Sequence, residues 1–252
     1  MNEDDLSVLD FDLDADFESP LDEIEPIESE PAAEPDPDAM LALLSSEDIS
    51  QRIVAARAFS EIQDERAIVH LIRLLRDVCP LVRVSAAYGL GRNPSLDAAE
   101  ALIHQLEKDW NGYVRKGIVW ALGNCGDRAA IAPLTKALKM DIPAVRLWSA
   151  SALAQLAKLE YNDIIAAIPP LIYGLRRDPI AAVRGNCAWA IGKLCRELPS
   201  NVVYATAIDA LLETLVEDED MGVTEDARSS LLSVGDPRGL QMIETLEKEG
   251  LV

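Results

Sequence analysis

The chain has 252 residues, of which 49% are hydrophobic, and its formal net charge is −21 at pH 7. This much apolar content can bury a large core, in one elongated domain or in two compact ones. The negative charge argues against nucleic acid and anionic membrane surfaces as partners, because phosphate binding requires a basic stripe. No stretch reaches the roughly 18 apolar residues of a membrane span, and the N-terminus lacks the basic start of a signal peptide. We therefore expect a soluble, cytoplasmic protein.

The first segment, residues 1–38, carries 16 of the 44 acidic residues and no lysine or arginine. Such a segment cannot bury enough apolar surface to offset the entropy cost of ordering, so we predict a disordered acidic tail. Within it, Phe11, Leu13 and Phe17 alternate with aspartates. We favour a solvated tail that keeps the protein soluble; the alternative is that these three side chains form a docking motif.

After the tail, the chain repeats itself. Five segments begin with an aspartate and continue into an apolar helical pattern, at Asp77, Asp109, Asp141, Asp178 and, more weakly, Asp218. In four of them an arginine recurs at intervals of 31, 32 and 38 residues, and another lies 31 residues upstream. These arginines are Arg52, Arg83, Arg115, Arg146 and Arg184. A period of about 30–40 residues with two helices per unit is typical of an α-solenoid, so we predict about six such units over residues 39–252.

The second helix of each unit has a buried stripe. Val82, Ala86 and Leu90 are spaced four residues apart, and the same spacing recurs in the following units. Glycines such as Gly91 and Gly123 come near the ends of these helices, where a chain reversal favours them. The pattern predicts antiparallel helix pairs that bury one face against their neighbours.

The repeated pattern D-x-x-x-x-V-R-x-x-A-A-x-A-L-G resembles the HEAT repeat, in its short bacterial form, from about residue 39 to 250. This resemblance implies an all-α fold, a curved right-handed stack of helix pairs. The WALG and WAIG signatures and the chain length resemble the cyanobacterial and red-algal HEAT proteins related to phycobilin lyase subunits of the E/F type. They are also similar to the cyanobacterial HEAT protein that partners an A-type iron–sulfur scaffold. Thr224 stands where the last unit should have its arginine, as suits a terminal cap.

In HEAT repeats, aspartates and arginines form a ladder between successive units. The resemblance therefore implies a structural role for a set of charged residues in this chain. These are Asp77, Asp109 and Asp178 with Arg83, Arg115, Arg146 and Arg184.

A row of aromatic residues is the candidate functional site. Five positions after the repeated arginine come Tyr88, Trp120, Ser151 and Trp189, which lie off the buried stripe and on one face of the second helices. In HEAT-like solenoids the second helices line the concave surface. The positions two and nine residues after the arginine share this face, and they add Trp148, Asn186, Arg92, Asn124 and Lys193. We interpret the row as a recognition groove; the alternative is that the rings pack between helices and stiffen the stack.

Four cysteines are too few and too scattered for a disulfide framework, and no pair has the CxxC spacing of a zinc site. We expect reduced thiols and no metal site. Cys187 falls on the buried stripe, whereas Cys125 lies in the glycine-rich loop GNCGD and is predicted to be the exposed, reactive thiol.

No catalytic motif is present: the chain has no Gly-rich phosphate loop and no HExxH. We predict a non-catalytic scaffold that grips a partner protein in its groove. By resemblance it would aid cofactor assembly or retention, with a bilin or a shared iron–sulfur cluster as the cofactor. The alternative is a phycobilin lyase-like enzyme that attaches or detaches bilin on phycobiliproteins. Such an enzyme needs no nucleophile of its own, since it only holds the bilin in position. A scaffold for an unrelated system also remains open.

Overall fold

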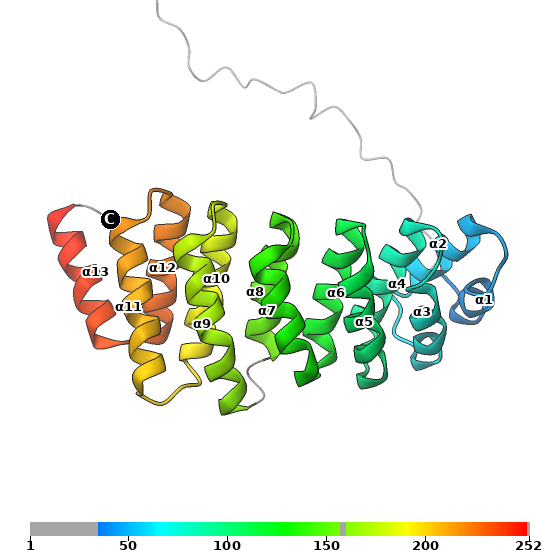
Figure 1. Cartoon of the computed structure of the whole chain (residues 1–252), viewed down its shortest axis with the longest axis horizontal. Helices are drawn as coiled ribbons and strands as arrows, with labels where there is room; N and C mark the ends of the chain where they lie inside the picture. Colours follow the sequence, from blue (N-terminus) through cyan, green and yellow to red (C-terminus); the bar gives the residue numbers. More distant parts are fainter. Residues whose placement is uncertain (1–34, 157–159, 251–252) are drawn as a thin grey trace, which may run out of the picture. The chain divides into compact units, whose positions relative to one another are not determined.

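The computed structural model describes residues 35–156 and 160–250, and within these ranges all regular structure is helical. Six helix pairs follow one another along the chain, and a single final helix closes the described part (Figure 1). The first four pairs are α1 (Pro37–Leu43) with α2 (Ile49–Ala58), α3 (Ile68–Leu74) with α4 (Pro80–Arg92), α5 (Leu96–Lys108) with α6 (Gly112–Cys125), and α7 (Ile131–Met140) with α8 (Pro143–Leu156). The last elements are α9 (Tyr161–Arg177) with α10 (Ala181–Cys195), α11 (Val202–Glu217) with α12 (Met221–Val234), and α13 (Pro237–Glu249). The predicted all-α solenoid is confirmed.

The helix boundaries follow from local chemistry. Asp36 accepts a hydrogen bond from the backbone of Asp38, and Pro37 occupies the first helical position, so α1 begins two residues before position 39. Asn111 and Asp220 cap α6 and α12 in the same way. Gly126 follows α6 with a φ of 75°, a left-handed conformation that glycine adopts without steric cost. Capped ends and left-handed glycines therefore set the unit boundaries that the repeat predicts.

The helices form two layers. The first helices, α3, α5, α7, α9 and α11, lie in one layer, and the second helices, α4, α6, α8, α10 and α12, lie in the other. Neighbouring second helices pack against one another more closely than neighbouring first helices do. The second helices therefore form the more tightly packed layer of this unit.

The predicted buried stripe forms the core between the layers. Val82, Ala86 and Leu90 of α4 are all fully buried, as are Val114, Ile118 and Leu122 of α6. Burial of such side chains is worth about 1.5–3 kcal/mol each for the larger ones, and it repeats in every unit. Among the described residues, no helix is both long and apolar enough to cross a membrane.

Candidate functional site

The predicted aromatic row lies on the second helices, at the positions two, five and nine residues after the ladder arginine. We call the surface that these positions form on α4, α6, α8 and α10 the second-helix face. Helical geometry places these offsets on one side of each helix, away from both the buried stripe and the ladder arginine. The row crosses four consecutive units.

The rings on this face differ in how far they reach into solvent. Trp189 on α10 is 42% exposed, whereas Tyr88, Trp120 and Trp148 are half-buried. Trp189 is therefore the most exposed of the four rings that were predicted to share this face, and none of the four is fully buried. Their inner sides pack between neighbouring helices, and their outer sides remain accessible.

Tyr88 and Trp120 form a contact pair across two units. Their ring centroids are 5.6 Å apart at an interplanar angle of 46°. The ring of Trp120 also lies directly over Gly91 of α4, at a place where a Cβ atom would collide with it. The absence of a side chain at Gly91 thus lets the two helices hold the indole between them, and Trp120 contributes both to packing and to the accessible face.

Cations accompany the two other tryptophans. The Lys116 ammonium lies 5.6 Å from the ring centroid of Trp148, and the Lys193 ammonium lies 4.6 Å from that of Trp189. Such cation–π contacts are worth about 0.5–1 kcal/mol at exposed sites, and they hold a positive charge beside an aromatic surface. The helical offsets predict Lys193 on this face but not Lys116, which directly follows a ladder arginine.

The amides of the row bind protein backbone. Asn124 Nδ2 donates to the carbonyl of Gly91 at 3.0 Å, and its Oδ1 accepts from Gln155 at 2.8 Å. Asn186 Nδ2 donates to the carbonyl of Leu147 and to Ser151 Oγ. These hydrogen bonds join successive second helices, so the two asparagines stabilise the stack and leave ligand contacts to the aromatic and cationic side chains.

Charge is segregated on the second helices. The five helices α2, α4, α6, α8 and α10 contain no aspartate or glutamate, in a chain whose net charge is −21. After the ladder arginines, their cations are Arg57, Arg92, Lys116 and Lys193. The second-helix face is therefore aromatic and cationic on a strongly acidic protein.

A pocket of about 230 Å³ marks the end of this face, between α10 and α12. Trp189, Lys193 and Arg196 line it from α10, and Asp226 with Ser229 and Ser233 line it from α12. Asp226 thus borders the face at this end, and at the other end Arg92 shares a pocket with Asp64 and Glu65.

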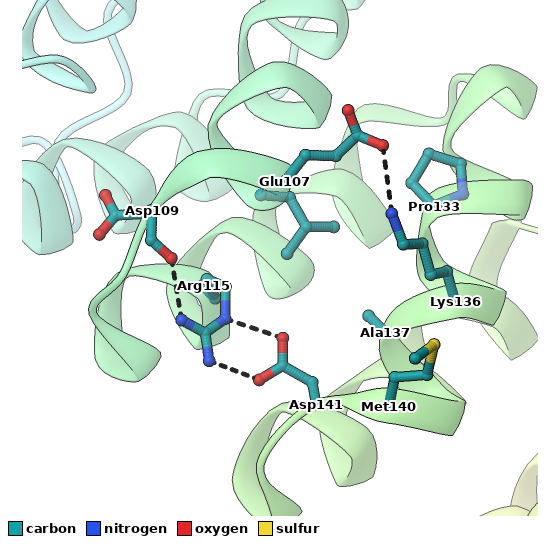
Figure 2. A pocket seen from close by; sticks show the side chains of 9 residues that line it. Glu107, Asp109, Arg115, Pro133, Lys136, Ala137, Met140 and Asp141 are labelled. Carbon is teal, nitrogen blue, oxygen red and sulfur yellow. Dashed lines mark hydrogen bonds and ion pairs between the residues drawn. The ribbon is translucent and has the colours of Figure 1, made fainter.

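The ladder lies on another side of the same helices, and the structure brings its members together. Arg83 Nε and Nη2 donate to Asp109 at 2.7 and 3.0 Å, and Nη1 donates to the backbone carbonyl of Asp77 at 2.9 Å. Arg115 repeats this arrangement with Asp141 and the carbonyl of Asp109 (Figure 2). Each arginine therefore joins its own unit to the carboxylate of the next. The complete set of pairs is Arg52–Asp77, Arg83–Asp109, Arg115–Asp141, Arg146–Asp178 and Arg184–Asp218.

The ladder also includes two carboxylates that were not predicted to belong to it, Asp141 and Asp218. Asp141 precedes its arginine by five residues, where the other units have six, and it accepts from the backbone of Ile142 directly after it. Asp218 belongs to the unit that lacks an arginine of its own. Both could have been found from the rule that each arginine pairs with the following unit.

Two of the ladder aspartates have a lowered pKa. Burial acts to raise the pKa of Asp109, but hydrogen bonds from Arg83 and Gln105 outweigh it and hold the pKa below its ordinary value. The hydrogen bond from Arg184 lowers the pKa of Asp218. These carboxylates are structural partners, and they are poorly suited to proton transfer near neutral pH.

The prediction holds for Cys187, which is fully buried on the stripe, and fails for Cys125. Cys125 is 7% exposed and its pKa is raised by burial, so the expectation of an exposed, reactive thiol there is wrong. As the last residue of α6, it continues the buried stripe, at seven residues after Ile118. Burial also raises the pKa of Cys187 and Cys195 to about 12. Cys79, at the start of α4, is only partly buried.

Four exposed aromatic residues of the described chain lie outside the predicted row, and they are Trp110, Tyr113, Tyr161 and Tyr173. Trp110 and Tyr113 are each 76% exposed; Trp110 lies in the turn between α5 and α6, and Tyr113 is the second residue of α6. The Arg83 guanidinium lies 5.9 Å from the ring centroid of Trp110. The tail residues Phe11, Leu13 and Phe17 lie outside the described residues. Within the described ranges, no cluster of three or more His, Cys, Asp or Glu could hold a metal ion.

The fold and the face define the class of the protein: an α-solenoid scaffold suited to protein binding. The sequence pattern of HEAT repeats matches residues 37–117 and 99–166, and a second HEAT-repeat pattern matches residues 167–198. The chain belongs to the HEAT-repeat family. No curated protein matches its sequence.

Solved structures agree on the fold. A designed armadillo repeat protein in complex with the peptide (KR)4 is 23% identical, with a TM-score of 0.61 over 79% of this chain and 98% of its own. The complex of CpcE and CpcF of phycocyanin lyase from Nostoc sp. PCC7120 is 23% identical, with a TM-score of 0.57 over 88% and 84%. Kap121p is 16% identical, with a TM-score of 0.64 over 83% of this chain and 24% of its own. At these identities the likeness concerns the fold.

Proposed function

We propose that this protein is a non-catalytic scaffold that binds a partner protein on its second-helix face, and that the bound segment is acidic with large apolar side chains. The observation that carries the proposal is the charge and ring pattern of the second helices: α2, α4, α6, α8 and α10 contain no carboxylate, and the last four carry the aromatic row with Lys116 and Lys193 beside it. An acidic partner would be repelled by most of this protein and attracted here.

The chemistry of the face favours a peptide. Aromatic side chains supply a large contact area at a low cost in conformational entropy, and they dominate binding energies at protein interfaces. Lys116 and Lys193 lie beside two of these rings and Arg92 is exposed at the end of α4, and these cations suit carboxylates of the bound segment. The designed armadillo neighbour was solved with a basic peptide. A basic peptide requires an acidic surface, whereas the second-helix face of this chain is cationic.

The test is an unbiased selection of binding peptides. A library of random displayed peptides is selected against the full chain, and the enriched sequences are synthesised for equilibrium binding by fluorescence anisotropy. We expect enrichment of aspartate and glutamate together with aromatic or large aliphatic residues. The double variant Trp189→Ala/Lys193→Glu should weaken their binding by roughly tenfold or more, as expected for loss of an interface hot spot.

A matched control comes from another surface. Trp110→Ala/Lys139→Glu replaces the same residue types away from the second-helix face and changes the net charge by the same amount. It should leave the affinity within about twofold, as expected for residues outside the binding site. Enrichment of basic peptides, or equal affinity of wild type and the Trp189 variant, would reject the proposal.

A role in bilin chemistry is the second candidate, and the likeness to the CpcE–CpcF complex of phycocyanin lyase supports it. In this proposal the aromatic rings hold a flat tetrapyrrole while Arg92 and Lys193 bind its propionates. Purified protein is mixed with phycocyanobilin, and the absorption spectrum is recorded. A red-shifted, enhanced band that Trp120→Ala reduces would support the lyase-like role, and an unchanged spectrum would remove it.

Assistance to iron–sulfur assembly is a third proposal and rests on the sequence resemblance alone. Among the four thiols, Cys79 is the only one outside the buried core, so it would be the thiol that contributes to a shared cluster. Cys79→Ser should then abolish any cluster transfer to or from an A-type scaffold. Full transfer by that variant would exclude ligation by this chain.

A further inference from the structure

The N-terminal segment of this chain has the chemistry that the second-helix face is proposed to bind. Residues 1–34 lie outside the described ranges, and their sequence contains aspartates and glutamates but no lysine or arginine. The large apolar residues of this segment include Phe11, Leu13 and Phe17, which alternate with carboxylates. An acidic segment with large apolar side chains is therefore part of the same polypeptide as the face.

The alternation in this segment is strict over residues 9–18, with the sequence LDFDLDADFE. Every odd position is apolar and every even position is an aspartate or a glutamate. In an extended backbone, successive side chains point to opposite sides, so one side would be apolar and the other acidic. A helical backbone turns by about 100° per residue and would direct Phe11 away from Leu13 and Phe17. The pattern therefore suits a segment that binds in extended form.

The spacing of the apolar residues matches the spacing of the rings on the face. Phe11 and Phe17 would lie about 20 Å apart in an extended chain, at ~3.3 Å per residue. Trp120 and Trp189 belong to α6 and α10, which both pack against α8 between them. Packed helices lie about 8–10 Å apart, so two helix spacings amount to roughly 16–20 Å. The two phenylalanines can thus meet two rings of the row at once, with Leu13 over α8.

Charge favours this pairing over the middle of the face. The helices α4, α6, α8 and α10 contain no aspartate or glutamate, and Lys116 and Lys193 lie beside tryptophan rings there. Asp226 and Asp64 border the face towards its two ends. Exposed charges attract one another over about 8 Å at physiological ionic strength, so carboxylates on the outer side of the segment need no direct contact with the lysines. The attraction is therefore strongest between the two ends.

The chain that connects the segment to the solenoid is long enough for binding within one molecule. From Phe17 to Pro37, where α1 begins, an extended chain spans at most roughly 66–72 Å. The contacts of the second helices run from α2 through α4, α6 and α8 to α10. These four helix spacings amount to roughly 32–40 Å, which the connection can cover. A short linker also sets an effective concentration on the order of 1 mM, which favours the chain's own segment over that of a second copy.

We propose that residues 9–18 bind in extended form to the second-helix face of the same molecule and compete there with the partner protein. This inference rests on the function proposed above and adds its regulation. With an effective concentration on the order of 1 mM, a segment whose own Kd is about 0.1 mM weakens every competitor roughly tenfold. Only a partner segment that binds more tightly, or that is abundant, would displace the chain's own segment.

The experiment opens the face in the full chain and measures the gain. A labelled synthetic peptide of residues 7–20 is titrated with wild type and with the full-length variant Phe11→Ala/Leu13→Ala/Phe17→Ala, and binding is followed by fluorescence anisotropy. We expect the variant to bind the peptide roughly tenfold more tightly than wild type, because its own segment no longer competes. An acidic peptide from the library selection should show the same gain.

Two further variants locate the effect. Leu21→Ala/Ile24→Ala/Ile27→Ala removes three large apolar residues from the same N-terminal segment but outside the alternating stretch, and it should bind the peptide as wild type does. Addition of Trp189→Ala/Lys193→Glu to the opened variant should reverse the gain, because these side chains belong to the face. Thermal unfolding monitors the fold of each variant.

The outcomes separate this inference from the function on which it rests. If library-selected acidic peptides bind wild type and the opened variant equally, or if the peptide of residues 7–20 does not bind the opened variant, the intramolecular competition is rejected and the binding face stands. If no acidic peptide binds either chain, both proposals fall. A wild-type dimer in sedimentation that the opened variant dissociates would also overturn the inference, because the segment would then occupy a second copy.

Discussion

The ladder and the second-helix face lie on the same helices and use positive charge in opposite ways. In the ladder, Arg83 and Asp109 are almost fully buried, with side-chain exposures of 7% and 0%, and the arginine also binds a backbone carbonyl. On the face, Lys116 and Lys193 lie over tryptophan rings, on helices that contain no carboxylate. Positive charge thus stabilises the stack on one side of these helices and lies beside tryptophan rings on the other, and the position around the helix decides which.

The largest expected effect breaks the ladder. Arg83→Ala leaves the Asp109 carboxylate buried without its cation, and it should cost about 3–5 kcal/mol of unfolding free energy. Arg238→Ala removes ion pairs at a side chain that is 47% exposed and should cost under about 1 kcal/mol. Urea unfolding followed by circular dichroism measures both variants. Equal losses would mean that the ladder contributes no more cohesion than a surface ion pair.

The next effect concerns the contact between Gly91 and Trp120. Gly91→Ala adds a methyl group where the indole lies, and it should cost about 1–3 kcal/mol although alanine favours a helix over glycine. In a Trp120→Ala background the same change should be neutral or stabilising, because the obstruction has been removed. The double-mutant cycle measures this coupling. Identical effects in both backgrounds would show that the ring does not rest on the glycine.

A smaller effect depends on pH. Because Arg184 lowers the folded-state pKa of Asp218, their interaction stabilises the protein above the unfolded pKa of about 3.9 and is lost as the pH falls through the lower folded value. Asp218→Asn should cost about 1–2 kcal/mol at pH 7. The gap in Tm between wild type and variant should stay constant down to about pH 5 and close below about pH 4. A gap that widens in acid contradicts this assignment.

The smallest effect leaves stability unchanged and concerns thiol reactivity. Burial raises the pKa of Cys125, Cys187 and Cys195, whereas Cys79 is only partly buried. The native protein should therefore react with Ellman's reagent at one thiol in a fast phase. Cys79→Ser should remove this phase and Cys125→Ser should retain it. The reverse result would restore the interpretation drawn from the glycine-rich loop.

The fold could be predicted because its signals are periodic. A ladder arginine every 31, 32 or 38 residues, together with a stripe that keeps helical spacing, defines the helix pairs without knowledge of their contacts. The same periodicity places Cys125 on the buried stripe, whereas its glycine neighbours indicated an exposed loop. Asp141 was missed because its turn is one residue shorter than the others.

The site was less predictable, because its properties arise between helices. Helical phase groups Tyr88, Trp120 and Trp189 on one face, but how deeply each ring lies depends on the neighbouring helix, as at Gly91. Trp110 lies in a turn, where helical periodicity predicts nothing. Pairwise packing and turns are therefore where the structure adds most to the sequence.

The central claim concerns where a partner binds, and photo-cross-linking tests it most directly. An acidic peptide from the selection carries a photoreactive group, is irradiated with the full chain, and the adducts are located by mass spectrometry. We predict adducts on α4, α6 and α10, close to Tyr88, Trp120 and Trp189. Adducts confined to the first helices α5, α7 and α9 would contradict the account.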